Sequence, residues 1–127
     1  MNIKDIDKLP SVLPIEEVNL YMGQLLDVIN SDSSINSLDA AVSISDLISF
    51  QGYNKEGLSF EISMKILNWI KRNYDSSNLE LTDYCLSNLA NLTCKEAIDY
   101  LKHILASAST EWERKEISQA LDEIIKR

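Results

Sequence analysis

Apolar residues recur at steps of three and four along most of this 127-residue chain. That spacing places side chains on one face of an α-helix. The residues that show this spacing after Pro14 are Ile15, Val18, Met22, Leu25 and Ile29. The whole sequence has only three glycines and two prolines, whereas a sheet protein needs such residues for its tight turns. The sequence therefore predicts an all-α fold without strands.

Polar breaks divide the chain into about six predicted helices. The first four are expected at 14–30, 37–50, 57–74 and 82–92. Gly52 is a stop signal just beyond the second. Thr93 and Thr110 each begin a Thr-x-x-Glu sequence, the form of the capping box that opens a helix. They are expected to start the fifth and sixth helices.

The 57–74 segment carries apolar residues over most of its circumference, including Phe60, Met64 and Leu67. A helix of this kind is packed on several sides, so it is the predicted central helix. The helices are expected to pair as antiparallel hairpins over 14–50, 58–92 and 94–127. These lengths are close to HEAT or armadillo units, which favours a small right-handed stack; a compact irregular bundle is the alternative. A single domain over 1–127 is expected, with 1–13 as a leader segment.

The charges are unevenly placed. Between Lys8 and Lys55 there is no Lys, Arg or His, and the acidic residues of that gap are Glu16, Glu17, Asp27, Asp32, Asp39 and Asp46. These six acids account for most of the net charge of −8. Such a surface attracts basic partners and repels phosphate. Acidity that serves solubility alone is the other interpretation.

Helical geometry groups these acids further. Glu16 and Asp27 are 11 residues apart, about three turns, so they project from the same side of the first helix. Asp39 and Asp46 share a direction on the second helix. If the two helices form a hairpin, these four carboxylates line one side together with Asp32 in the loop. The predicted partner-binding residues are therefore Glu16, Asp27, Asp32, Asp39 and Asp46.

Signatures of catalysis, cofactors and nucleic-acid binding are missing from the sequence. The paired acids Glu16/Glu17 and Asp122/Glu123 are adjacent residues, which diverge on a helix instead of facing one substrate. Asp99 and His103 stand four apart and can touch, but a metal site needs further ligands and His103 is the only histidine. No phosphate-binding glycine loop or basic face occurs. We expect no enzyme, no metal and no cofactor.

The cysteines and tryptophans are best explained as core residues. Cys85 and Cys94 have no metal-like spacing and are expected to be reduced thiols, with a disulfide as the alternative. Trp69 and Trp112 are expected in helix packing, although a half-exposed tryptophan is a candidate interface anchor. No apolar run is long enough to span a bilayer, and the N-terminus has no signal-peptide pattern, so a cytosolic location without membrane contact is expected.

A short, acidic, all-helical chain of this kind resembles the bacterial immunity proteins of contact-dependent growth inhibition and related polymorphic toxin systems. The resemblance covers size and character and involves no diagnostic motif, so it transfers no functional residue. It implies a stoichiometric inhibitor that binds a cognate basic toxin, often a nuclease. The alternative is a helical-repeat adaptor or assembly subunit that binds a peptide or a partner helix in an apolar groove. The oligomeric state and the concave side of the stack stay open.

Overall fold

The computed structural model of the chain describes residues 13–50 and 57–126. Within these residues it contains six α-helices and no strand, which confirms the all-α prediction. The helices are α1 (Ile15–Ser31), α2 (Ser37–Ser49), α3 (Phe60–Asn73), α4 (Leu79–Ala90), α5 (Lys95–Ser107) and α6 (Glu111–Ile125). The leader predicted over 1–13 and the stop signal at Gly52 lie outside the described residues, except for Leu13. Leu13 is buried, and its N–H donates to the carbonyl of Phe50.

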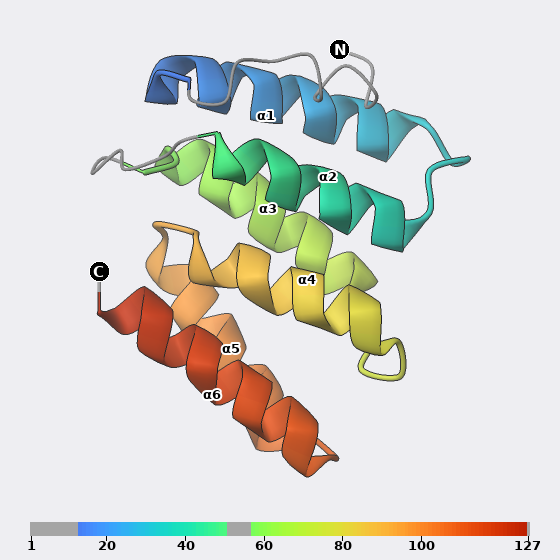
Figure 1. Cartoon of the computed structure of the whole chain (residues 1–127), viewed down its shortest axis with the longest axis vertical. Helices are drawn as coiled ribbons and strands as arrows, with labels where there is room; N and C mark the ends of the chain where they lie inside the picture. Colours follow the sequence, from blue (N-terminus) through green and yellow to red (C-terminus); the bar gives the residue numbers. More distant parts are fainter. Residues whose placement is uncertain (1–12, 51–56, 127) are drawn as a thin grey trace.

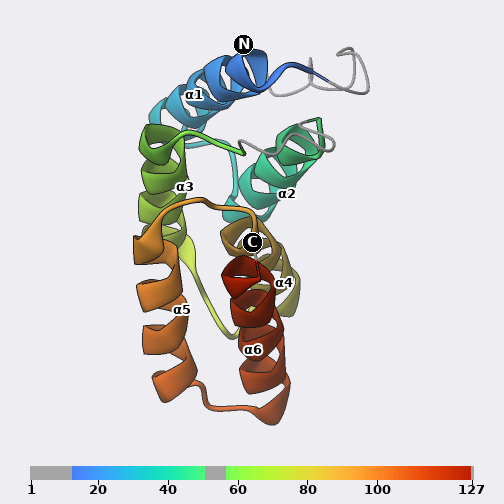
Figure 2. The ribbon, with the colours of Figure 1, turned by 90° about the vertical axis from the view of Figure 1, so that its left-hand side faces the viewer.

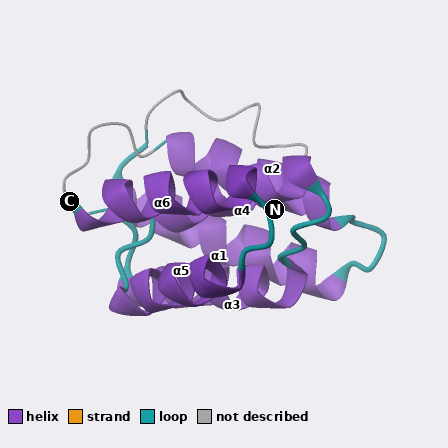
Figure 3. Cartoon of the chain, turned by 90° about the horizontal axis from the view of Figure 1, so that it is seen from below, coloured by secondary structure: helices purple, strands orange, loops and turns teal. Residues whose placement is uncertain are grey.

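The helices form two layers. α1, α3 and α5 follow one another in the first layer, and α2, α4 and α6 follow one another in the second (Figures 1 to 3). Each consecutive pair, α1–α2, α3–α4 and α5–α6, contributes one helix to each layer. Alternation of this kind is the arrangement of a stack of helical hairpins, in which each hairpin buries its apolar faces against its neighbours.

Buried positions recur from hairpin to hairpin. The inward residues of α2 are Ala40, Ala41, Ile44, Leu47 and Ile48. Forty-one residues later, α4 buries Leu81, Thr82, Cys85, Asn88 and Leu89. Corresponding buried positions of the two helices are therefore occupied by different residue types, including polar ones. This is why the repeat is invisible as a sequence consensus.

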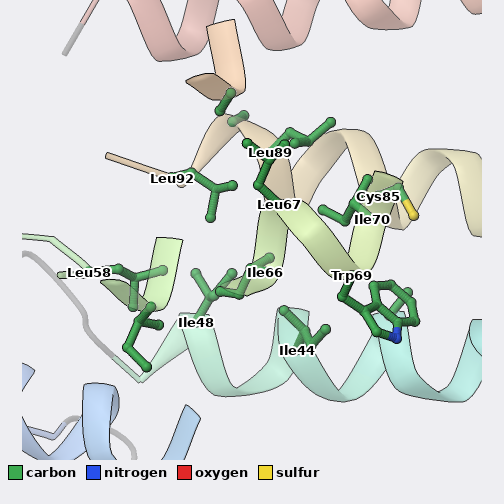
Figure 4. Close-up of a cluster of buried hydrophobic side chains, with 14 of the residues drawn as sticks. Ile44, Ile48, Leu58, Ile66, Leu67, Trp69, Ile70, Cys85, Leu89 and Leu92 are labelled. Carbon is green, nitrogen blue, oxygen red and sulfur yellow. The ribbon is translucent and has the colours of Figure 1, made fainter. Parts of the chain in front are cut away.

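The core runs between the layers, and α3 and α4, the hairpin in the middle of the stack (Figure 1), both contribute buried residues to it. Ile66, Leu67 and Ile70 of α3 are fully buried, and they belong to the same hydrophobic cluster as Leu89 of α4 and Ile44 of α2 (Figure 4). The predicted central position of the third helix is thus correct, although α4 shares it. The prediction that Phe60 covers a second packed face is wrong, because Phe60 lies in the first turn of α3 and is 62% exposed.

Four of the described helices, α2, α3, α4 and α6, begin at a side chain that accepts a backbone N–H group. Thr110 caps α6 as predicted, with Oγ1 accepting from the N–H of Glu113. The capping box predicted at Thr93 is wrong, since α5 begins after Cys94. The Thr93 hydroxyl donates instead to the carbonyl of Leu58, at 2.8 Å. This bond connects the α4–α5 loop to the segment that precedes α3. α4 begins earlier than predicted because Asn78 caps it through Leu81.

The same Asp-Ser-Ser turn joins the layers twice. In the α1–α2 connection, Oδ1 of Asp32 accepts the N–H and hydroxyl of Ser34 at 2.9 and 2.6 Å. In the α3–α4 connection, Oδ1 of Asp75 accepts both groups of Ser77 at 3.0 and 2.6 Å. These bonds lower the pKa of both carboxyl groups, since they stabilise the ionised form.

We expect the substitution Ser34→Ala to raise the pKa of Asp32 toward its ordinary range and leave that of Asp75 unchanged. The hydroxyl bond to Asp32 is the larger cause of its lowered pKa, and the variant removes it. Because the folded pKa is depressed, these turns contribute stability above the ordinary aspartate pKa and lose it as the pH falls through the folded pKa. Carboxyl carbon shifts followed by NMR against pH measure both groups in one titration. Equal pKa values for Asp32 in the two proteins would contradict the assignment.

Both cysteines are free and buried, as the sequence predicts. Burial raises the pKa of the Cys85 thiol to about 12, which makes it unreactive near neutral pH. Among the described helices, none combines the length and apolar content needed to cross a membrane.

Candidate protein-binding surface

All six acids of the N-terminal charge gap have exposed side chains. Glu16, Glu17 and Asp27 belong to α1, Asp39 and Asp46 belong to α2, and Asp32 lies in the turn between these helices. The structure therefore places no acid of this set in the core. Their directions, however, differ from the sequence-based expectation.

Glu16 and Asp27 lie on the flank of α1 that adjoins α3. Three residues after Glu16, the Asn19 side chain accepts the N–H of Ser59 at 3.0 Å. Three residues after Asp27, the Asn30 side chain accepts from the Arg72 guanidinium at 3.1 Å. Residues three apart share a helix face. The two acids therefore project beside α3, in the first layer.

Asp39 and Asp46 project from the second layer. They lie about 140° and 160° around α2 from Ile44, which is completely buried. Both side chains therefore point away from α1 and α3. The expectation that four carboxylates line one side of the first hairpin is wrong, because α1 and α2 belong to different layers and expose opposite faces.

The face of Asp39 and Asp46 continues across α4 and α6. Glu80 stands on α4 at the position that corresponds to Asp39, forty-one residues later, and it is exposed. Between α4 and α6 lies a shallow groove of about 200 Å³. Asp83 lines it from α4, and Glu116 and Glu123 line it from α6. We call the resulting surface the outer acidic face: Asp39, Asp46, Glu80, Asp83, Glu116 and Glu123.

Cations on this face are fewer than acids. Lys115 and Lys126 are exposed on the same side of α6, so two ammonium groups stand against six carboxylates in the described part of the face. On α3, in the opposite layer, the Arg72 guanidinium donates to the Asn30 side chain of α1, and Lys65 Nζ lies 3.6 Å from the Glu61 carboxylate. The negative field is therefore strongest over the second layer and is not confined to the N-terminal half of the chain.

Sequence reasoning missed Glu80, Asp83, Glu116 and Glu123. Glu116 and Glu123 occur in a part of the sequence where acids and bases alternate, so the local net charge is small. Glu80 and Asp83 lie in a second stretch without bases, between Arg72 and Lys95, which holds only three acids. A helix sorts such residues by direction, because residues three or four apart share a face. The signal that could have found these acids is helical spacing. Asp83 and Ser87 share one face of α4, and Glu116 and Glu123 share one face of α6; both faces line the groove between the two helices.

Two exposed apolar side chains occur at the starts of α4 and α6. Leu79 is 60% exposed and Trp112 is 39% exposed. Trp69, by contrast, is buried in the core, as predicted. Trp112 is thus the tryptophan that meets the condition for an interface anchor, and an anchor of this type contributes strongly to binding when a partner covers it.

The remaining candidate groups are the metal-ligating and nucleophilic side chains. No group of three or more His, Cys, Asp or Glu side chains suited to a metal is found among the described residues. Asp99 and His103 both line a groove between α3 and α5, and buried Cys85 and Cys94 are unsuited to nucleophilic attack because burial raises the pKa of each thiol. No protein-family model, curated protein or solved structure matches this chain.

Proposed function

We propose that this protein is a non-catalytic binding module and that a protein partner with a basic surface docks on the outer acidic face. The observation that carries the proposal is the clustering of Asp39, Glu80, Asp83, Glu116 and Glu123 on one layer of the stack. Close carboxylates repel one another. A basic partner relieves that repulsion and is drawn to the surface by the long-range field.

The class of partner that best fits this surface is a toxin domain with a cationic substrate-binding cleft, such as a nuclease. Docking of the outer acidic face over such a cleft would exclude the phosphate backbone of its substrate. The size, acidity and all-helical fold of the chain agree with the character of bacterial immunity proteins. In this proposal the chain acts by occupying the toxin, and it supplies no reacting group.

Neutralising the α4–α6 part of the face tests the proposal. We expect Asp83→Asn/Glu116→Gln/Glu123→Gln to slow association with the cognate basic toxin domain by about 10-fold or more at low salt, because steering by charge accelerates encounter by about 10–10³-fold. High NaCl should largely remove the difference between wild type and variant. Stopped-flow measurement of the association rate at several NaCl concentrations checks both statements.

A matched control separates the two acidic surfaces. Glu16→Gln/Glu17→Gln/Asp27→Asn changes the net charge by the same amount, but on α1. It should slow association much less. Equal or greater slowing by this variant, or rates independent of salt, would contradict docking on the outer acidic face. Circular dichroism of both variants shows whether the helices are intact.

A second candidate function is a helical-repeat adaptor that binds a partner helix, and exposed Trp112 and Leu79 favour it. In this function apolar contact supplies the affinity, so binding changes little with salt. Trp112→Ala would then weaken binding at all salt concentrations. The salt series above therefore distinguishes this adaptor from the charge-steered inhibitor.

A further inference from the structure

A groove of about 560 Å³ lies between α3 and α5, in the first layer. Its lining residues are Lys71, Glu96, Asp99, Tyr100 and His103. The volume is within the range of about 300–1,000 Å³ that small-molecule sites occupy. Since the outer acidic face belongs to the second layer, this groove is a separate place on the molecule.

The floor of the groove is an aromatic ring held in a defined position. The rings of Tyr100 and Tyr74 meet edge to face, with centroids 6.4 Å apart. The Tyr74 hydroxyl in turn donates to the Glu113 carboxylate at 2.6 Å, and Glu113 is 4% exposed. This chain of contacts from α6 fixes Tyr74 and so restricts Tyr100.

The face of Tyr100 already carries a positive charge from the protein itself. Lys71 Nζ lies 5.8 Å from the ring centroid, within cation–π range. Lys71 is exposed, so this contact is weak and the side chain is free to swing into solvent. The lysine thus marks a place where the ring and its surroundings stabilise a cation.

The charges around the ring favour a cation as well. Glu96 and Asp99 contribute two carboxylates against the single ammonium group of Lys71. One oxygen of Glu96, Oε2, is shielded from solvent and has no hydrogen-bond partner. A carboxylate oxygen in this state gains free energy when a donor reaches it. The groove therefore offers an aromatic face and two acidic side chains, and one of these, Glu96, has an oxygen that lacks a donor.

We propose that the α3–α5 groove binds a small organic cation, a guanidinium or alkylammonium compound, that replaces Lys71 over Tyr100. The cationic group stacks on the ring, and its N–H groups donate to Asp99 and Glu96. A planar guanidinium suits both contacts, because it stacks on aromatic faces and donates to carboxylates in pairs. The proposal is independent of the function proposed for the outer acidic face.

Titration with agmatine, which carries a guanidinium and an amine, tests this site. We expect saturable shifts of the amide signals of Tyr100 and His103 in NMR spectra. Asp99→Asn should weaken binding by about 10-fold or more, as expected for loss of one charge-assisted hydrogen bond. Lys71→Met should bind agmatine about 2–5-fold more tightly, because the internal competitor at the ring is removed. Tyr100→Leu should remove most of the binding.

Asp83→Asn is the matched control, since it removes one charge from the opposite layer and should leave agmatine affinity unchanged. Non-saturating shifts spread over both layers would overturn the proposal. So would equal affinities for wild type, Lys71→Met and Asp99→Asn, variants that alter exposed side chains and leave the core intact.

Discussion

Replacement of Leu25 by alanine is expected to lower the free energy of unfolding by about 2–5 kcal/mol. Leu25 lies in α1 and is completely buried. The substitution removes apolar contacts and leaves a cavity, because the surrounding close-packed side chains relax only in part. Urea unfolding followed by circular dichroism at 222 nm, a standard wavelength, measures the change.

The control is the same substitution in the same helix at Leu20, which is 58% exposed. Leu20→Ala makes no cavity, and alanine favours a helix slightly more than leucine, so its effect should stay within about 0.5 kcal/mol. Comparison of the two variants separates the effect of burial on stability from the effect of helix propensity. Similar losses for both variants would mean that α1 does not pack on the stack in the orientation described.

The second large effect is expected for Tyr74→Phe, which should lower the free energy of unfolding by about 1–3 kcal/mol. The variant removes the 2.6 Å hydrogen bond to Glu113. It leaves a carboxylate that is 4% exposed with the N–H of Ser109, at 3.3 Å, as its remaining partner. This contact joins the end of α3 to the start of α6. Its loss should therefore loosen the third hairpin against the second.

The pH dependence of Tyr74→Phe should also differ from that of the wild type. Burial, followed by the Glu113 hydrogen bond, raises the pKa of Tyr74. The folded state therefore holds the proton more tightly than the unfolded state. The stability linked to Tyr74 is present below the ordinary tyrosine pKa of about 10 and is lost as the pH rises above it. Tyr74→Phe has no hydroxyl to ionise, so it lacks this part of the stability loss at alkaline pH.

Tyr84→Phe serves as the control, because the Tyr84 hydroxyl has no hydrogen-bond partner in the described part of the chain. Its stability should match the wild type within about 0.5 kcal/mol. Urea unfolding at neutral pH and above the tyrosine pKa compares the three proteins. If Tyr74→Phe and Tyr84→Phe behaved alike at both pH values, the Tyr74–Glu113 contact would carry no stability.

Local signals predicted most of the secondary structure. The spacing of Ile15, Val18 and Met22 places the buried face of α1 correctly, and Thr110 caps α6 as expected. These features depend on residues within one or two helical turns. Where a residue had a distant partner the prediction was wrong, as for Thr93, whose hydroxyl bonds to Leu58.

The acidic surface likewise divides into a local part that the sequence predicts and a long-range part that it does not. That Asp39 and Asp46 share one direction, as Glu16 and Asp27 do, follows from helical spacing. The sequence could not show that the two pairs face opposite ways, because this depends on which layer each helix joins.

By itself the sequence determined the helical class, the inward face of each helix and the negative sign of the charge, because all three follow from composition and the 3.6-residue period. The tertiary structure alone decided which helices share a layer. It thereby brought Asp83 of α4 beside Glu116 and Glu123 of α6 and placed Lys71 of α3 over Tyr100 of α5. Contacts between residues about thirty or more apart depend on how whole apolar faces pack, and local spacing carries no information about that choice.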